Sequence, residues 1–76
     1  MPHFEIIDID FQATEVLLRH KGENIVADMW DQYFEQAERE QWKPGGKLEA
    51  VLRYAPSRHT GMPVLVFMGN VKYSEK

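Results

Sequence analysis

Side chains suited to chemistry gather in one stretch, residues 55–62, which reads "APSRHTGM". Arg58, His59 and the hydroxyls of Ser57 and Thr60 are donors suited to a phosphate or a carboxylate. Loops between strands also hold such residues simply to shape a bend. Ser57 and His59 do not make a catalytic pair on their own, because the base must be oriented by a third group and an oxyanion needs donors. We expect Arg58 and His59 to contact a partner rather than a reacting substrate.

A second set of chemical groups is the pair Asp8 and Asp10, two residues apart in "IIDID". With a histidine supplied by the fold, they could bind a hard divalent metal or act as an acid and base. Alternating acids are also common on solvent-facing strands, where they discourage pairing with other chains. The three histidines have no spacing typical of a metal site. We therefore predict no catalytic residue, no metal and no cofactor.

Charge is divided unevenly along the chain. Residues 1–40 contain three basic and ten acidic residues (net −7), whereas residues 41–76 contain six basic and two acidic ones (net +4). The basic half can offer cations to phosphates and rings to unstacked bases. The residues of this alternative nucleic-acid surface are Arg53, Tyr54, Arg58, Lys72 and Tyr73. A net charge of −3 weighs against it, since nucleic-acid modules are usually basic.

The elements that position these groups begin with a strand predicted over residues 4–9, where apolar and acidic residues alternate. Residues 13–20 are ambiguous. Val16, Leu17 and His20 recur at helical spacing, yet Val16, Leu18 and His20 also alternate as a strand would. Both interpretations stay open.

The clearest pattern is helical and covers residues 24–41, "NIVADMWDQYFEQAEREQ". Its apolar residues fall on one stripe, and its acidic residues collect on the opposite face. We predict a long amphipathic helix that ends near Trp42, because the following "KPGG" disfavours helix.

The last part of the chain predicts a β-hairpin. Residues 47–54 alternate as a half-buried strand does, and "PVLVFMG" at residues 63–69 is apolar on both sides. The predicted fold is a single α+β domain over residues 1–76. It has a small antiparallel sheet of three strands, or four if residues 13–20 form a strand, with one long amphipathic helix packed on one face. The element order is β-(α or β)-α-β-β.

Such a fold leaves apolar surface uncovered. One helix covers one face of a small sheet, yet Leu65 and Phe67 point to the opposite side from Val64, Val66 and Met68. We therefore predict a small non-enzymatic accessory protein that acts by binding another protein, in the style of small bacterial or phage proteins, with a homodimer as one form of this binding. The predicted partner contacts are Arg58, His59, Trp42, Leu65 and Phe67.

The expected location follows from what the sequence lacks. There is no cysteine, which fits a reducing compartment. The first residues show no basic and apolar leader, and no stretch approaches the roughly 20 apolar residues of a membrane span. We expect a cytoplasmic protein.

Overall fold

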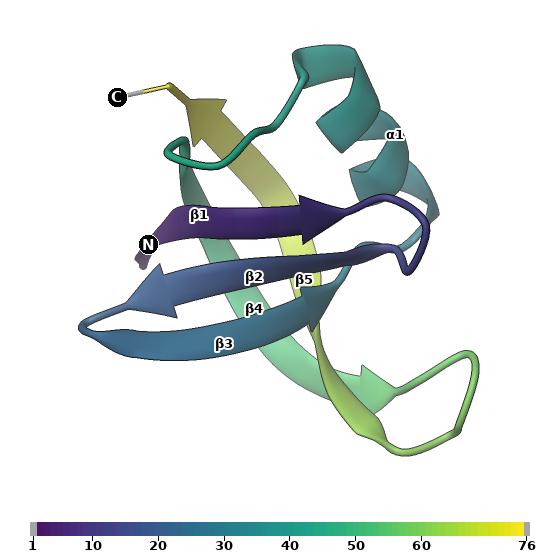
Figure 1. Cartoon of the computed structure of the whole chain (residues 1–76). Helices are drawn as coiled ribbons and strands as arrows, with labels where there is room; N and C mark the ends of the chain where they lie inside the picture. Colours follow the sequence, from purple (N-terminus) through teal and green to yellow (C-terminus); the bar gives the residue numbers. More distant parts are fainter. Residues whose placement is uncertain (1, 76) are drawn as a thin grey trace.

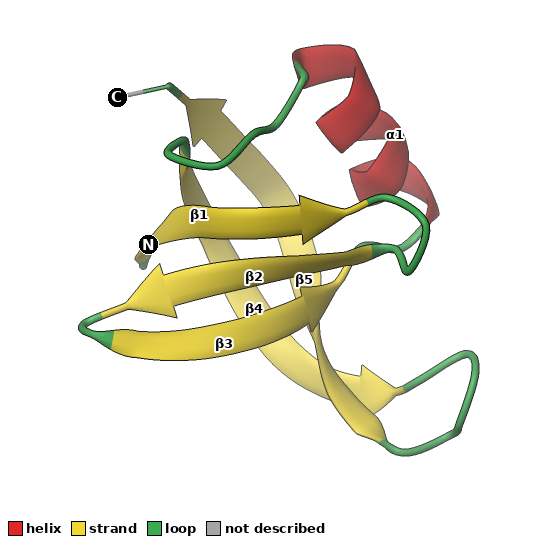
Figure 2. Ribbon diagram, in the orientation of Figure 1, coloured by secondary structure: helices red, strands yellow, loops and turns green. Residues whose placement is uncertain are grey.

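Five strands and one helix make up the computed structural model, which describes residues 2–75 (Figures 1 and 2). The elements are β1 (His3–Asp10), β2 (Glu15–His20), β3 (Glu23–Asp28), α1 (Asp31–Glu40), β4 (Lys47–Pro56) and β5 (Pro63–Ser74). The strands close into a barrel in the order β1-β2-β3-β5-β4, and β4 pairs back with β1. All pairs are antiparallel except β3 with β5. A five-stranded barrel of this topology, with its helix between the third and fourth strands, has the architecture of the OB-fold.

The predicted α+β fold is wrong, because the expected long helix does not exist. Its first part, residues 24–28, belongs to strand β3 (Glu23–Asp28), and of the rest Asp31–Glu40 is helical. The reason lies in the preceding turn. Lys21 and Gly22 both have positive φ angles, 51° and 81°, as a tight hairpin between β2 and β3 requires. The β-branched Ile25 and Val26 then continue along β2 as a strand, and tertiary pairing overrides the helical stripe.

The ambiguous stretch is settled by the same hairpin. Residues Glu15–His20 form β2, with Val16 and Leu18 completely buried in the barrel. Of the two interpretations, the strand is therefore the correct one. It brings the number of strands to five, so the sheet closes on itself instead of presenting one open face to a helix.

A β-bulge decides which residues of β1 enter the core. The pairing of β1 with β2 shifts between Ile6 and Asp8, which leaves Ile7 as the extra residue. Before the bulge Phe4 and Ile6 are buried, and after it Ile9 packs against the core. One extra residue reverses the alternation, so a strict two-residue pattern misassigns this strand.

Helix α1 lies at one end of the barrel, beside β5 (Figure 1). Tyr33 and Ala37 are buried, and the Tyr33 ring contacts Phe67 with centroids 5.5 Å apart. The helix is also fastened to the backbone of β5. The Tyr33 hydroxyl donates a hydrogen bond to the Gly69 carbonyl (2.8 Å), and Gln36 Nε2 donates one to the Val71 carbonyl (2.7 Å). No helix among residues 2–75 has the length and apolarity needed to cross a membrane.

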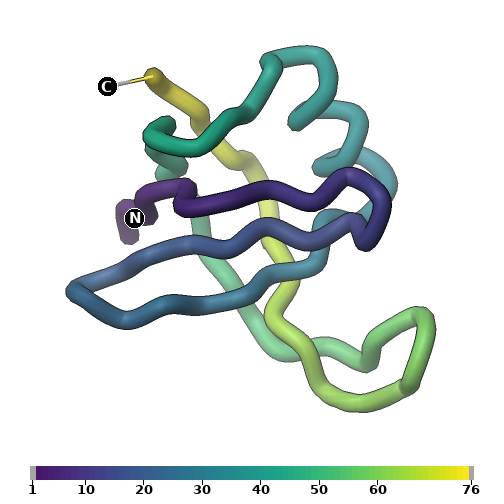
Figure 3. Tube along the Cα trace, in the orientation of Figure 1, coloured from purple at the N-terminus to yellow at the C-terminus, as the bar shows by residue number. Residues whose placement is uncertain are grey.

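The predicted C-terminal hairpin is confirmed and is longer than expected. Strands β4 and β5 pair from Lys47–Ser74 to Pro56–Pro63, with an irregularity between Glu49 and Val51. The trace in Figure 3 shows the closed end of this hairpin extending beyond the rest of the barrel. The connecting loop, residues 57–62, holds Ser57, Arg58, His59 and Thr60.

Candidate functional site

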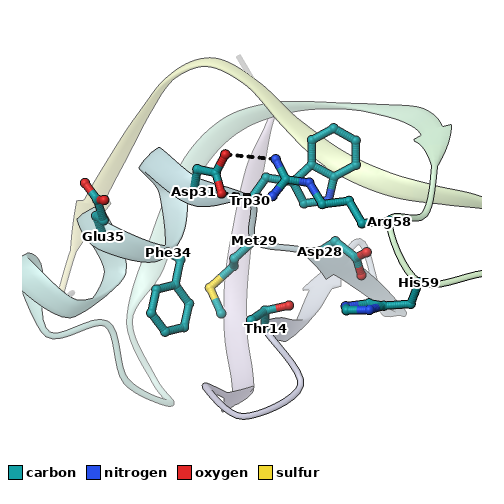
Figure 4. Close-up of a pocket in the computed structure, with 9 residues that line it drawn as sticks. All are labelled: Thr14, Asp28, Met29, Trp30, Asp31, Phe34, Glu35, Arg58 and His59. Atoms are coloured by element: carbon teal, nitrogen blue, oxygen red, sulfur yellow. Dashed lines mark hydrogen bonds and ion pairs between the residues drawn. The ribbon is translucent and has the colours of Figure 1, made fainter.

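The hairpin loop is attached to the start of α1 through Arg58. Its Nη1 and Nη2 each donate a hydrogen bond of 2.9 Å to one of the two carboxylate oxygens of Asp31 (Figure 4). The same guanidinium lies 4.8 Å from the ring centroid of Trp30. A two-pronged ion pair and a cation–π contact together fix the guanidinium plane. Arg58 is therefore engaged within the chain and is not a free cation.

This ion pair shifts both titrations. The hydrogen bond from Arg58, and then its positive charge, lower the pKa of the Asp31 carboxyl below the ordinary aspartate value. The same hydrogen bond raises the pKa of Arg58. Both side chains are largely exposed, so the pair holds the loop in place more than it stabilises the fold.

The hydroxyls of the loop are used to shape it. Ser57 Oγ accepts hydrogen bonds from the backbone amides of His59 (3.1 Å) and Thr60 (3.4 Å). Thr60 Oγ1 accepts one from the Met62 amide (3.2 Å). The Ser57 amide in turn donates to the Met62 carbonyl (2.8 Å). Ser57 and Thr60 thus act as connector residues that support a turn.

A pocket of about 330 Å³ lies between this loop and the start of α1 (Figure 4). It is lined by Thr14, Asp28, Met29, Trp30, Asp31, Phe34, Glu35, Arg58 and His59. The sequence singled out Arg58 and His59, but it placed Asp28 and Asp31 only on the acidic side of a long helix. Asp28 is instead the last residue of β3, and Asp31 is the first residue of α1. The pocket exists because the strand ends where it does, which no local pattern indicates.

The three apolar residues predicted as partner contacts face the barrel interior. Trp42 is 3% exposed and Phe67 4% exposed, and their rings meet edge to face at 5.9 Å. Leu65 is half-buried and packs against the same core. In this chain Trp42 and Phe67 are therefore core residues, and Trp42 also borders a surface hollow beside Phe11 and Ala37.

The nucleic-acid alternative is left with a scattered set of residues. Tyr73 stacks on Trp42 in the interior, with centroids 6.1 Å apart. Arg53, Tyr54 and Lys72 are exposed. Arg53 on β4 pairs with Val66 on β5, and Val66 stands six residues before Lys72 on that strand. The two cations are therefore separated by roughly 20 Å along the strands. These residues do not form one basic patch.

Asp8 and Asp10 also have local structural roles. Asp10 Oδ1 accepts hydrogen bonds from the amides of Gln12 and Ala13, both at 3.0 Å, and so shapes the turn after β1. Asp8 Oδ1 accepts one from the Ile9 amide at 2.9 Å. Within residues 2–75 no group of three or more histidine, aspartate or glutamate side chains is close enough to hold a metal ion.

The side of β5 opposite Leu65 and Phe67 contributes to an apolar surface on the outside of the barrel. Val64 and Met68 lie on this side, and Val66 between them is buried without being part of the core cluster. Across the neighbouring strands, pairing places further apolar side chains on the outer side, in the pairs Leu17–Val26 and Val51–Met68. We call the set Leu17, Val26, Val51, Val64 and Met68 the outer apolar face.

The exposure of this face is substantial for apolar residues. Val26 is 51% exposed, Met68 42% and Val51 38%. Beside it, the outer side of β1 and β2 carries carboxylates. Asp10 pairs with Glu15, and Asp8 pairs with Leu17 of the outer apolar face itself. Arg53, exposed on β4 opposite Val66, lies among these apolar residues. The surface is therefore mostly apolar, with an arginine within it and carboxylates along one margin.

Comparison with known proteins does not assign a family: no family model matches the chain, and no curated protein matches it at a significant level.

Proposed function

We propose that this protein is a non-enzymatic binding protein whose outer apolar face docks on another protein. The observation that carries the proposal is the exposure of Val26, Val51 and Met68 on neighbouring strands of the barrel. Apolar side chains grouped on the outside of a barrel leave apolar area in contact with water, and larger groups of this kind mark interaction surfaces. The domain is thus an accessory protein that acts through contact and not through chemistry.

Charge favours a protein partner over a nucleic acid. In OB-folds the face of strands two and three, with its flanking loops, is the surface that takes oligonucleotides. Here that side of the barrel carries Asp8, Asp10 and Glu15 around Leu17 and Val26. Carboxylates at this position repel phosphates, whereas they complement lysine and arginine residues at the rim of a protein surface. Arg19 on β2 and Arg53 on β4 also point outward, so the excess of carboxylates is confined to the margin that Asp8, Asp10 and Glu15 form. Fold architecture alone does not assign a function.

The partner is therefore an apolar protein surface with a basic margin. A second copy of the chain is the other occupant that the same face allows, which would give a symmetric dimer. A reducing, cytoplasmic setting fits a chain without cysteine.

Affinity capture with matched variants tests the proposal. Val26→Glu and Met68→Glu each place a charge on the outer apolar face, whereas Gln32→Glu adds the same charge on the exposed side of α1. After nuclease treatment, wild-type protein and Gln32→Glu should retain the same partner, and both face variants should lose it. Retention of that partner by both face variants would reject this surface as the contact.

Two further measurements test whether a second copy of the chain or a nucleic acid binds to the outer apolar face instead. Sedimentation velocity over a concentration series detects a dimer, which Met68→Glu should dissociate if the face pairs with itself. Fluorescence anisotropy with a single-stranded RNA oligonucleotide checks the nucleic-acid alternative. Tight binding that weakens steeply with salt and is lost in Arg53→Gln would replace protein binding as the function.

A further inference from the structure

The pocket between the hairpin loop and α1 has an excess of negative charge. Asp28, Asp31 and Glu35 line it, and the described residues of its wall supply one arginine, Arg58. That arginine gives both of its bonding nitrogens to Asp31. The remaining carboxylates are not neutralised by Arg58, so the pocket attracts a cation.

Asp28 is the carboxylate of the pocket that is both largely buried and unpaired. Its side chain is largely buried, with 9% of the residue exposed. Within residues 2–75 its carboxylate has neither a hydrogen bond nor an ion pair. Figure 4 shows the carboxylate directed into the pocket, on the side of His59. Among residues 2–75 the fully buried side-chain atom without a hydrogen-bond partner is the Tyr73 hydroxyl. The unpaired oxygens of Asp28 therefore still reach the solvent of the pocket, where a bound cation can pair with them.

The geometry of the pocket selects the kind of cation. No group of three potential ligands in the described chain can hold a metal ion. The flat guanidinium position over Trp30 is already taken by Arg58. A compact ammonium on a flexible stem can reach a single recessed carboxylate. Met29 and Phe34 give the methylene groups of such a stem an apolar wall.

The size and position of the pocket suit one side chain of a protein docked on the outer apolar face. About 330 Å³ is at the lower end of the range of ligand pockets, which suits one side chain. Val26 of the outer apolar face stands two residues before Asp28 on the same side of β3, roughly 7 Å away along the strand. A protein docked on that face can therefore place one side chain in the pocket.

We propose that this pocket receives a lysine side chain of the partner protein, with Asp28 as the residue that pairs with its ammonium group. That the lysine belongs to a protein docked on the outer apolar face rests on the proposed function. The affinity of the pocket for a lysine side chain is independent of that function, because a free lysine derivative should bind there too. A recessed carboxylate that gains a charged partner within a contact would also explain how the protein selects one partner among many apolar surfaces.

Amide chemical shifts of the ¹⁵N-labelled protein test this. Nα-acetyl-lysine amide is titrated into the millimolar range, and its Nε-acetylated derivative serves as the probe without charge. The lysine probe should give saturable shifts at the amides of Thr14, Asp28 and His59, and the uncharged probe should give none. Asp28→Asn should weaken binding at least about tenfold, the loss expected for a charge-assisted hydrogen bond. Glu38→Gln, an exposed acid of α1 outside this pocket, should leave binding unchanged.

The outcomes are separable from those of the capture experiment. Equal shifts from both probes, or lysine shifts spread over all acidic surfaces, would overturn the pocket proposal on wild-type protein alone, even if Asp28→Asn failed to fold. If the lysine probe binds as expected but no partner depends on the outer apolar face, the pocket stands and the docking surface falls. If a partner depends on that face but the lysine probe does not bind, the docking surface stands and the lysine pocket is rejected.

Discussion

At the scale of single residues, the hairpin loop owes its position to the ion pair of Arg58 with Asp31. Because the pKa of Asp31 is lowered in the folded state, the pair contributes above the unfolded-state pKa of this aspartate. That contribution disappears as the pH falls through the folded-state value. In Arg58→Gln the pKa of Asp31 should rise toward the ordinary value. Carboxyl ¹³C titration by NMR measures this directly.

The matched control for that titration is Lys43→Gln, which removes another surface cation, paired with Glu75 at 3.5 Å. It should leave the titration of Asp31 as in wild type. If Asp31 titrates identically in wild type and Arg58→Gln, the two-pronged contact is not formed in solution and the loop is held by other contacts.

Tyr73 offers a second test at this scale. Its ring stacks on Trp42, while its hydroxyl is buried without a hydrogen-bond partner in the described chain. Tyr73→Phe keeps the ring and removes the unsatisfied group, so it should stabilise the protein by about 1 kcal/mol. Chemical denaturation measures the change in the free energy of unfolding. A loss of stability of similar size would show that the hydroxyl has a partner, such as an ordered water.

At the scale of elements, the turn between β2 and β3 brings β3 alongside β2 as a hairpin. Gly22 has a φ of 81°, and a Cβ added there would meet no atom within 4 Å, so Gly22→Ala has a backbone cost alone. We expect a loss of about 1 kcal/mol in the free energy of unfolding, measured by chemical denaturation. Lys21→Asn in the same turn is the control. It should be neutral or stabilising, since asparagine tolerates the left-handed conformation found at Lys21. A neutral Gly22→Ala would contradict the turn geometry.

The neighbouring elements show how much of the fold is encoded locally. The C-terminal hairpin was predictable, because Leu48, Ala50 and Leu52 alternate with exposed or half-buried residues and keep that alternation in the barrel. Strand β3 was not, because Val26 and Met29 also fit a helical stripe with Tyr33, and nothing local marks the boundary after Asp28. The choice is made by the pairing of β3 with β2 and β5, and the contacts with β5 are distant in sequence.

The candidate site was predictable only in part, because the sequence pattern did not reveal the junction of β3 and α1. Arg58 and His59 stand out in the sequence and do line a pocket, but their acidic counterparts come from the junction of β3 and α1. The side of β5 that faces outward depends on how the barrel closes. Because "PVLVFMG" is apolar on both sides, its pattern does not distinguish Phe67 from Met68 as the core residue. Closure places the Phe67 ring in the core with Tyr33 and Trp42.

At the scale of the whole molecule, the protein is a closed barrel whose charged and exposed apolar side chains lie on the outside. The core is filled by apolar side chains, and α1 covers one end of the barrel. The surfaces suited to function are the outer apolar face, its acidic margin on β1 and β2, and the acidic pocket beside the start of α1. These three surfaces together suit an apolar protein partner with basic residues around the contact.

Site-specific photo-crosslinking tests the docking of a protein on the outer apolar face most directly. A photoreactive phenylalanine derivative is placed at Val26 or Met68 on that face, and at Gln32 on α1 as the control, in cells that produce the protein. We predict a discrete protein adduct of the same mass from Val26 and Met68 and none from Gln32. An adduct from Gln32 alone, or nucleic acid as the crosslinked species at Val26 and Met68, would contradict a protein-docking role for this face.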